Sequence, residues 1–388
     1  MAILIKSSHV AIVVRDLLKR DNQAFNDEEH LQAAMDWICM AQDITECGGV
    51  SAGYSLIKGW LGPYPETTGY IIPTFLRFAA SRANERYIER AIAMGDWEIE
   101  IQLSSGAVRG GFGINNYPIV FNTGQVMLGW ISLYNGKKLE RFLDAAKRAA
   151  DWLLSIQDSD GKWSKHTFRD IPHAYHTRVA WPLLNLYQVT KEEKYKISAE
   201  KQITWALNCS KENGWFDYMG FKVNEFPFTH TIAYTLDGLI ESSHHLVNAM
   251  KDRIVKIVCT ALENIVAKYR LNKEESFQNR VPLPATLDEK WESKDYYSCL
   301  TGDAQIAILL LKIYAICKIP MFWDAAFRLI ENLKIKQSVD SKDKFIRGAI
   351  AGSYPIWGRY SRFCYPNWAT KFFADALMLK RKIEHEMV

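Results

Sequence analysis

The feature that most constrains the fold of this chain is an internal repeat built around tryptophan. The four clearest copies are centred on Trp37, Trp97, Trp152 and Trp205. The fifth residue after each tryptophan is polar, and these residues are Gln42, Gln102, Gln157 and Ser210. The steps of 60, 55 and 53 residues, each followed by a glycine-containing turn, are typical of folds that stack one helical unit many times.

An amphipathic helix is predicted around each of these tryptophans. In KKLERFLDAAKRAADWLLSIQ (residues 137–157), apolar residues recur at three- and four-residue intervals and charged residues fill the opposite stripe. This spacing is typical of a helix with one buried face. The openings also repeat, with Glu85, Glu140 and Glu193 each followed by a basic and then an aromatic residue. We expect these helices to form an outer layer.

A second kind of helix alternates with the first. It follows a loop of glycine, proline and aromatic residues, and its sequence is apolar nearly all round, as in a helix buried on every side. A threonine recurs near each start, at Thr68, Thr123, Thr177, Thr231 and Thr301. Threonine is a favourable residue for capping a helix, and we expect it to do so here.

Together the two kinds of helix make six helical hairpins and about twelve helices, without a strand ladder. The loop at residues 48–70 also resembles the loop at residues 347–372, so the first and last hairpins match each other. Six hairpins can close into a ring, which removes the exposed ends that open repeat arrays must cap. The sequence therefore predicts an all-α fold, an (α/α)6 toroid with inner and outer helix rings, as a single domain over residues 1–388.

This pattern resembles the six-hairpin glycosidase-like superfamily over residues 27 to 385. The string Pro65-Glu66-Thr67-Thr68-Gly69 is similar to the first inner-helix entry of unsaturated-uronyl hydrolases of that superfamily. The resemblance implies a carbohydrate-active enzyme with its site on the face where the inner helices begin. Helix N-termini offer free N–H groups there, which favour anionic or hydroxyl-rich ligands.

Composition limits the class of ligand that we expect the protein to bind. Aromatic residues make up 13% of the chain, and we expect those in the loops before inner helices to line a cavity, while the periodic tryptophans are scaffold. The net charge of +4, from 48 basic and 44 acidic residues, is too balanced to indicate nucleic acid or an anionic membrane as a partner. The resemblance implies that the partner is a carbohydrate, including glycans that contain uronate, and the aromatic content agrees with this expectation.

Cysteine usage and the first residues indicate the compartment. Seven scattered cysteines without a CxxC pair argue against a disulfide framework and favour reducing surroundings. Residues 1–20 lack the pattern of a signal peptide, and no run of 18 uninterrupted apolar residues predicts a membrane span. We expect a cytoplasmic protein.

Four residues at inner-helix entries are candidate catalytic groups: Glu66, His176, His230 and Asp303. A carboxyl or imidazole there could transfer protons to or from a sugar. Glu66 and Asp303 would equally complement a helix dipole, and each histidine would equally cap its helix. The two histidines occupy equivalent repeat positions, and Arg178 adjoins one of them, which favours a site.

Residues expected to bind the substrate lie on the same rim. They are Tyr64, Asn122, Tyr175, Arg178, Trp215, Asp217, Tyr234, Trp357, Arg359 and Trp368. Arginine can hold a carboxylate by two hydrogen bonds, and aromatic faces stack on sugars. Structural explanations are N-capping for Asn122 and packing between hairpins for about half of the loop aromatics. Asp237, one turn deeper in an inner helix, requires a partner or a wet cavity.

Hydrolysis of an acidic glycan by carboxylate acid–base chemistry is the first hypothesis for the reaction. A polysaccharide lyase or uronate epimerase that uses histidine, tyrosine and arginine is the alternative. A glycan-binding toroid without catalysis and a terpene-cyclase-like toroid are further alternatives, although the acid and metal motifs of those cyclases are missing. Cys299 and Cys364 are the residues that a zinc site would use; we expect neither a metal nor a cofactor.

Overall fold

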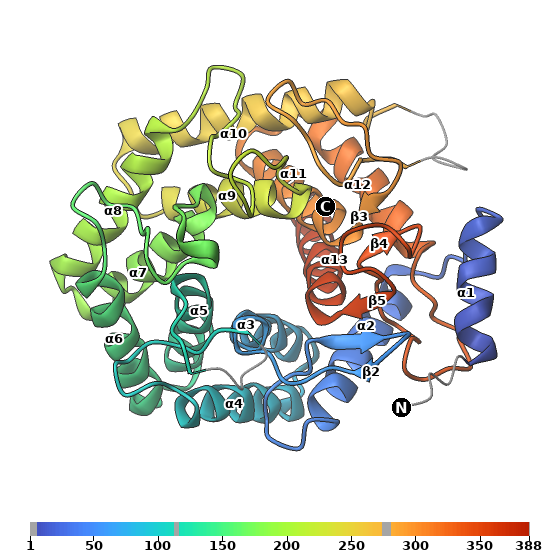
Figure 1. Cartoon of the computed structure of the whole chain (residues 1–388), viewed down its shortest axis with the longest axis horizontal. Coiled ribbons are helices and arrows are strands. Elements are labelled where there is room, and N and C mark those ends of the chain that lie inside the picture. The colour runs from blue at the N-terminus through green and yellow to red at the C-terminus, as the bar shows by residue number, and fades with distance from the viewer. Residues whose placement is uncertain (1–5, 112–115, 274–280, 388) are drawn as a thin grey trace.

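The computed structural model describes residues 6–111, 116–273 and 281–387. Within these ranges twelve helices form two concentric rings (Figure 1). The outer ring contains α2 (Asp27–Asp43), α4 (Glu85–Glu100), α6 (Glu140–Ser155), α8 (Glu193–Asn208), α10 (Asn248–Tyr269) and α12 (Pro320–Lys334). The inner ring contains α3 (Pro65–Arg82), α5 (Val120–Lys137), α7 (Thr177–Thr190), α9 (Thr229–Ser243), α11 (Leu300–Cys317) and α13 (Asn367–Met387). The predicted (α/α)6 toroid is confirmed.

The burial of the two rings follows the sequence pattern. In α6, Phe142, Ala146, Ala149 and Leu153 face the inside while the charged residues face outward. In α5, by contrast, Val120 to Ile131 are all buried, because this helix is covered on every side. Three outer helices begin at the glutamates that the repeat predicted. The sequence is therefore a good guide to which helix lies in which ring.

A glutamine joins each outer helix to the next in four of the six hairpins. Gln42 Nε2 donates to the carbonyl of Gly48 in its own turn (2.9 Å) and to that of Arg90 in the next outer helix (3.1 Å). Gln102 and Gln157 make the equivalent pairs of bonds. Gln337 is the sixth copy, and its Nε2 donates to Gly348 (2.6 Å) and to His30 in α2 (3.2 Å). The last unit is thereby joined to the first, and the ring is closed.

The recurring threonines do not cap the inner helices, contrary to the prediction. Thr68 is the fourth residue of α3; its hydroxyl donates to the carbonyl of Tyr64 and accepts from the backbone N–H of Val50, each at 2.9 Å. Thr123 repeats this arrangement with Ile119 and Val108. The threonine recurs because it ties the preceding loop to the first turn, and the capping residues there are larger and apolar or aromatic.

Short strands, which the sequence did not indicate, join the first and last hairpins. The strand β1 (Gly53–Ser55) pairs antiparallel with both β2 (Gly59–Trp60) and β5 (Cys364–Pro366), so Gly53 lies opposite Pro366. A second pair consists of β3 (Ser298–Cys299) and β4 (Ser353–Tyr354). These ladders explain why the loops at 48–70 and 347–372 resemble each other. The helix α1 (Ser7–Leu17) lies outside the rings beside them (Figure 1).

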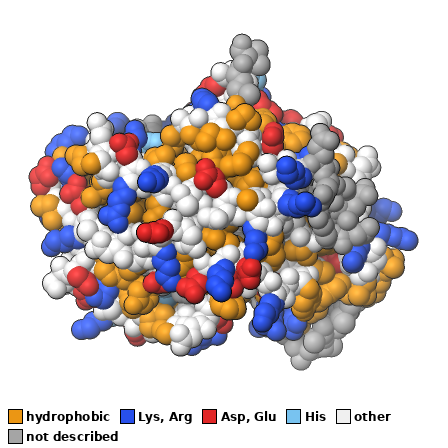
Figure 2. Space-filling view, turned by 90° about the horizontal axis from the view of Figure 1, so that it is seen from above, with side chains coloured by type: hydrophobic (Ala, Val, Ile, Leu, Met, Phe, Trp, Pro, Cys, Tyr) orange, Lys and Arg blue, Asp and Glu red, His pale blue; other side chains and the backbone are white. Residues whose placement is uncertain are grey.

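One inner helix, α11, is long and apolar enough to cross a membrane by length and composition. Its mean hydropathy is 1.5, but 72% of it is buried inside the ring, which accounts for the composition. On the outer face seen in Figure 2, basic and acidic side chains are interspersed, with apolar side chains scattered between them. That face shows the balance of charge that the composition indicated.

Candidate active site

A glutamate with an unusual pKa lies at the first inner-helix entry. Pro65 begins α3, and Glu66 follows it in the first turn. The Tyr64 hydroxyl donates to Glu66 Oε2 at 2.6 Å. Burial raises the pKa of the Glu66 carboxyl to about 7, although the Tyr64 hydrogen bond and the charge of Arg178 oppose the rise. Glu66 can therefore hold or release a proton near neutral pH.

Arg178 lies in the first turn of α7 and is almost fully buried inside the ring. Its Nε donates to Gln125 Oε1 (3.0 Å), and its Nη1 contacts Asp237 Oδ2. Lys312 contacts Asp237 from the other side at 2.5 Å. Burial raises the pKa of Asp237, but Lys312 and Arg178 outweigh it and keep the pKa below its ordinary value. The partner that Asp237 required is thus present, and its carboxylate is ionised.

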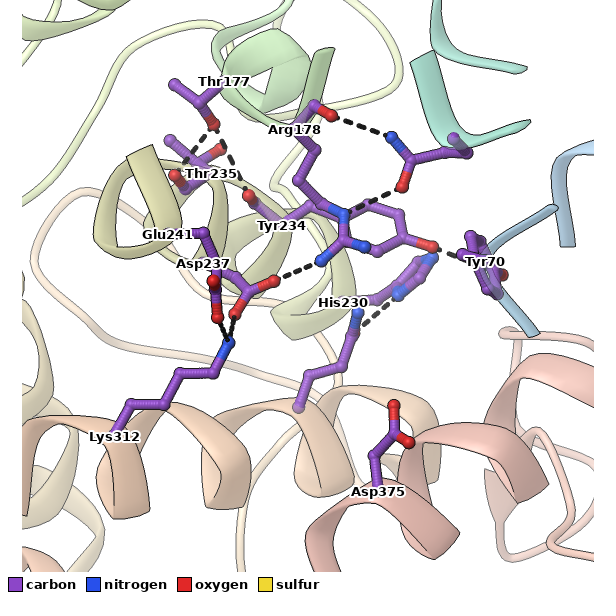
Figure 3. Close-up of polar contacts among 12 residues, drawn as sticks. Tyr70, Thr177, Arg178, His230, Tyr234, Thr235, Asp237, Glu241, Lys312 and Asp375 are labelled. Carbon is purple, nitrogen blue, oxygen red and sulfur yellow. Dashed lines mark hydrogen bonds and ion pairs between the residues drawn. The ribbon is translucent and has the colours of Figure 1, made fainter. Parts of the chain in front are cut away.

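Two residues of α9 lie beside this ion pair (Figure 3). The rings of His230 and Tyr234 are 4.3 Å apart, and the Arg178 guanidinium lies 4.9 Å from the Tyr234 ring. His230 Nδ1 bonds Gln305 Oε1 at 2.7 Å, and burial lowers the pKa of His230 to about 4. An amide oxygen only accepts, so Nδ1 carries the proton and Nε2 is left with a lone pair. His230 is therefore a neutral imidazole.

Burial also fixes the state of the phenol. It raises the pKa of Tyr234 well above its ordinary value, and the Tyr234 hydroxyl donates to the Tyr70 hydroxyl at 3.4 Å. Both tyrosines are thus protonated. The residues Glu66, Arg178, His230 and Tyr234, which we call the reactive cluster, combine a carboxylic acid, a cation, a neutral base and a phenol.

His176 is set apart from His230, although the repeat places both at equivalent positions. It is surrounded by aromatic rings, with Trp163, Tyr175 and His173 centred 5.3 to 6.0 Å away. Neither ring nitrogen has a hydrogen-bond partner among the described residues, and burial lowers the pKa of His176 well below its ordinary value. His176 therefore packs among aromatic side chains in the wall of the ring. It shares a repeat position with His230, but the residues that surround it are different.

Two of the predicted aromatic residues are placed to meet a ligand from the loop face. The rings of Tyr64 and Trp368 are 6.1 Å apart, both are partly exposed, and Trp368 Nε1 donates to the Tyr360 hydroxyl at 2.8 Å. Trp357 is also partly exposed. Tyr175, in contrast, is buried and stacks on His173 at 4.4 Å. Tyr64 and Trp368 therefore supply the aromatic surface beside Glu66.

Five other predicted residues have structural or surface positions. Asn122 is buried and donates to the carbonyl of Arg109 at 2.9 Å. Trp215 packs against Trp291 in the core, and Asp217 is exposed and pairs with Lys211 at 3.2 Å. Arg359 is exposed. Asp303 is fully buried, and burial raises its pKa well above the ordinary value. Packing or a surface ion pair accounts for Asn122, Trp215 and Asp217, whereas neither carboxyl oxygen of Asp303 has a hydrogen-bond partner among the described residues.

Sequence reasoning did not select six further polar residues inside the ring, of which Tyr70, Gln125 and Gln305 bond to the cluster directly. They are Tyr70, Gln125, Gln305, Lys312, Lys371 and Asp375. The sequence did contain an indication of these residues, because a polar side chain in a helix that is otherwise apolar on every side needs a polar partner. Asp375 shows this, since it accepts from Thr74 (2.9 Å) and pairs with Arg77 and Lys371 (both 2.7 Å).

The ring encloses a cavity of about 630 Å³. Its lining includes Tyr70, Arg178, Gln305 and Phe372, and it extends along the inner helices to Arg381 near the end of α13. The cavity therefore begins one turn inside Glu66 and reaches the opposite face. The sequence placed the cavity where the inner helices begin; of the predicted site residues, Arg178 is the one that lines it.

The described residues contain no group of three or more histidine, cysteine or acidic side chains that could hold a metal ion. Cys299, one of the two cysteines considered for zinc, is buried, and burial raises its pKa, so its thiol is protonated. In α11, that sulfur accepts from the N–H of Gly302 at 3.4 Å and caps the helix.

No family model matches the chain, and no curated protein matches it. Solved structures do. The cellobiose 2-epimerase of Spirochaeta thermophila DSM 6192 is 14% identical, with a TM-score of 0.68 over 99% of this chain and 100% of that one. The unsaturated glucuronyl hydrolase of Bacillus sp. GL1 is 15% identical (TM-score 0.65, 89% and 96% covered). A sugar epimerase from a ruminal bacterium is 11% identical (TM-score 0.70, 92% and 98% covered).

These matches establish the fold of the protein. The chain has the (α/α)6 toroid fold that these solved structures share, as the sequence predicted. The similarity extends over nearly the full length of both chains in each comparison. Identities below 25% carry no statement about the reaction, which must be argued from the side chains.

Proposed function

We propose that this protein is a carbohydrate-active enzyme whose reaction centre is the reactive cluster. The observation that carries the proposal is Glu66, a carboxyl with a pKa of about 7 at the loop face, beside the partly exposed rings of Tyr64 and Trp368. A group with this pKa is suited to give up a proton at neutral pH, and the rings offer faces for a sugar. The structural neighbours include sugar hydrolases and epimerases.

For the reaction itself we propose hydrolysis of a glycan that carries carboxylates. Glycoside hydrolysis uses one protonated and one ionised carboxyl, and pairs whose pKa values are pushed apart identify the two roles. Glu66, with its raised pKa, is the proton donor in this scheme. Asp237, kept ionised by Lys312 and Arg178, is the base that activates water. Arg178 supplies the positive charge that attracts the substrate carboxylate.

An epimerase or lyase is the second candidate, and the hydrogen bond from His230 to Gln305 favours it. This bond directs the protonated nitrogen away and leaves Nε2 of a neutral imidazole as a base. Tyr234 stays protonated and is the proton donor in this scheme, and the centre of its ring lies 4.3 Å from that of His230. Removal of a proton from the carbon next to a carboxylate needs this combination of a base and a proton donor.

The first experiment compares Glu66→Gln with Glu85→Gln. Glu85 is also a first-turn glutamate, but it lies exposed on α4 and pairs with Lys137 at 3.3 Å, so its substitution tests the interaction with a helix dipole together with a surface ion pair. We expect Glu66→Gln to lower turnover of acidic oligosaccharides by about 100-fold or more, with retained binding, and Glu85→Gln to leave turnover unchanged. Equal turnover in both variants would refute the role of Glu66.

The second experiment separates the two reactions. Hydrolysis releases new reducing ends and leaves the substrate carbons unlabelled in D₂O. Epimerisation incorporates deuterium at the carbon that changes configuration, and elimination produces unsaturated uronates that absorb near the ultraviolet edge. Deuterium in the product that is lost in His230→Gln would overturn hydrolysis in favour of the second candidate.

A further inference from the structure

The cavity inside the ring carries more positive charge than its acidic residues balance. Six lysine and arginine side chains line it, and four of them contact two carboxylates, two cations on each. Asp237 contacts Arg178 and Lys312, while Asp375 contacts Arg77 and Lys371. Glu241 adds one further carboxylate at 2.5 Å from Lys312. The half of the cavity around Asp375 therefore holds two cations against one anion.

The excess charge is concentrated at Lys371. Its ammonium lies 3.9 Å from the centre of the Phe372 ring and 5.0 Å from that of Tyr70, and its side chain is 6% exposed. Burial, together with the charges of Arg178 and Arg77, lowers the pKa of Lys371 to about 8, although Asp375 opposes this. A buried cation is costly without full compensation, so an anion placed here would be stabilised.

Arg77 can reach such an anion from the same side. Its guanidinium binds Asp375 through one nitrogen, Nη2, and 54% of its side chain is exposed even though it lines the cavity. Arg381 and Lys382 line the outer end, where α13 finishes. Arg381 and Lys382 are paired with Glu28 and Glu386, so the positive charge that attracts an anion into the cavity is mainly that of Arg77 and Lys371.

The rest of the lining is mostly apolar. Pro73, Trp181, Ile308 and Met378 are among the residues that form it. A volume of about 630 Å³ is within the range of roughly 300–1,000 Å³ that is usual for small-molecule sites. The shape and chemistry therefore suit a ligand with an apolar or aromatic body and one anionic group.

We propose that this cavity is a second ligand site, which binds a small organic anion with an aromatic or apolar body from the face opposite the loops. The anionic group contacts Lys371 and Arg77 beside the Asp375 carboxylate, which already binds both cations, and the body packs against the apolar wall. The site is distinct from the reaction centre because Glu66, His230 and Tyr234 do not line it. Arg178 and Asp237, the base of the proposed hydrolysis, also line the cavity, so occupancy of the cavity and the state of the reaction centre are linked through these two residues.

The test uses 8-anilinonaphthalene-1-sulfonate, a fluorescent aromatic anion, titrated into the full chain. Lys371→Met removes the buried charge while it keeps a long side chain. Ala80→Trp fills the outer part of the cavity, where Ala80 is exposed. Lys256→Met is the matched control, because Lys256 is an exposed lysine on the outer helix α10. Glu66→Gln separates this proposal from the proposed reaction.

We expect saturable binding of one dye molecule per chain, weakened at least tenfold by Lys371→Met and abolished by Ala80→Trp. Lys256→Met and Glu66→Gln should bind as the wild type does, and 1-naphthalenemethanol, which has the aromatic body without the charge, should not displace the dye. Unchanged affinity in both cavity variants would overturn the proposal, as would equal weakening in Lys256→Met or displacement by the neutral compound. Because the readout is binding alone, a failed Glu66 activity test leaves this result unaffected.

Discussion

Replacement of Gln337 by alanine tests whether the ring is held closed by a single buried side chain. Gln337 is fully buried between the last and first hairpins. Its Nε2 donates to the carbonyls of Gly348 (2.6 Å) and His30 (3.2 Å), and its Oε1 contacts His30 Nδ1. Alanine at this position would remove all three bonds, and would leave the Gly348 carbonyl and His30 Nδ1 unpaired while the His30 carbonyl keeps its bond within α2.

The magnitude follows from these two unpaired groups and the loss of the third bond. A buried polar group without a partner costs about 1–3 kcal/mol, and a water that enters the vacated space can restore part of it. We therefore expect Gln337→Ala to lower the free energy of unfolding by about 3–5 kcal/mol. The matched control is Gln157→Ala, in which the side chain also makes three bonds, to Gly161 and twice to Ser198. Gln157 is partly exposed, so water replaces those bonds and the expected loss is about 1–2 kcal/mol.

Urea denaturation followed by circular dichroism measures both losses, from the midpoint and the slope of the transition. The wild type and the two variants are compared in the same buffer at the same protein concentration. The reasoning would be refuted if Gln157→Ala were as destabilising as Gln337→Ala. It would also be refuted if Gln337→Ala lowered the free energy of unfolding by less than about 1.5 kcal/mol, since one unpaired buried group accounts for that much.

Three further predictions concern single residues. Gly348 has φ +86°, and a Cβ there would lie 2.1 Å from the carbonyl oxygen of Ala33, so Gly348→Ala should lower the free energy of unfolding by about 2–4 kcal/mol in a thermal melt. Gly136→Ala is the control, because a Cβ there would have no atom within 4 Å, and it should be neutral or slightly stabilising in the same assay. Burial raises the pKa of Glu98, so the native state loses stability as pH rises above the pKa of this carboxyl in the unfolded chain. Glu98→Leu should therefore raise the free energy of unfolding in urea titrations by about 1–3 kcal/mol, more at pH 8 than at pH 5, and an equal gain at both pH values would contradict this. If Glu66 is the proton donor, turnover should fall as pH rises through about 7, and a rate that is flat from pH 6 to 8 would exclude that role.

Much of the architecture could be read from the sequence because it is encoded locally. The spacing of apolar residues assigned each helix to a ring, and Glu85, Glu140 and Glu193 do begin outer helices. Gln42 and its repeats marked the turns, although the bond of each glutamine to the next hairpin could not be foreseen. The helix positions follow from short-range periodicity, which a single sequence displays directly.

The candidate site was predictable only in part. Glu66, Arg178, His230 and Tyr234 were all selected from the starts of inner helices. The structure brings Arg178, His230 and Tyr234 together (Figure 3), and Glu66 lies close enough for the charge of Arg178 to lower its pKa. His176 has the same repeat position as His230 but a different environment, and the sequence treated them alike. The repeat position of a residue determines how far along the axis of the ring its side chain lies. Its neighbours come from loops whose sequences do not repeat, so the repeat does not predict them.

The sequence by itself therefore determined that six hairpins form, which face of each helix is buried and which residues stand at the inner-helix entries. Tertiary structure alone decided which of them meet. Arg178 and Asp237 are 59 residues apart in the chain, and Lys312 is a further 75 residues away, yet the three form one ion-pair network. Closure of the ring creates these contacts and the cavity they line, because the distance across a barrel depends on all six hairpins and on no local segment of the chain.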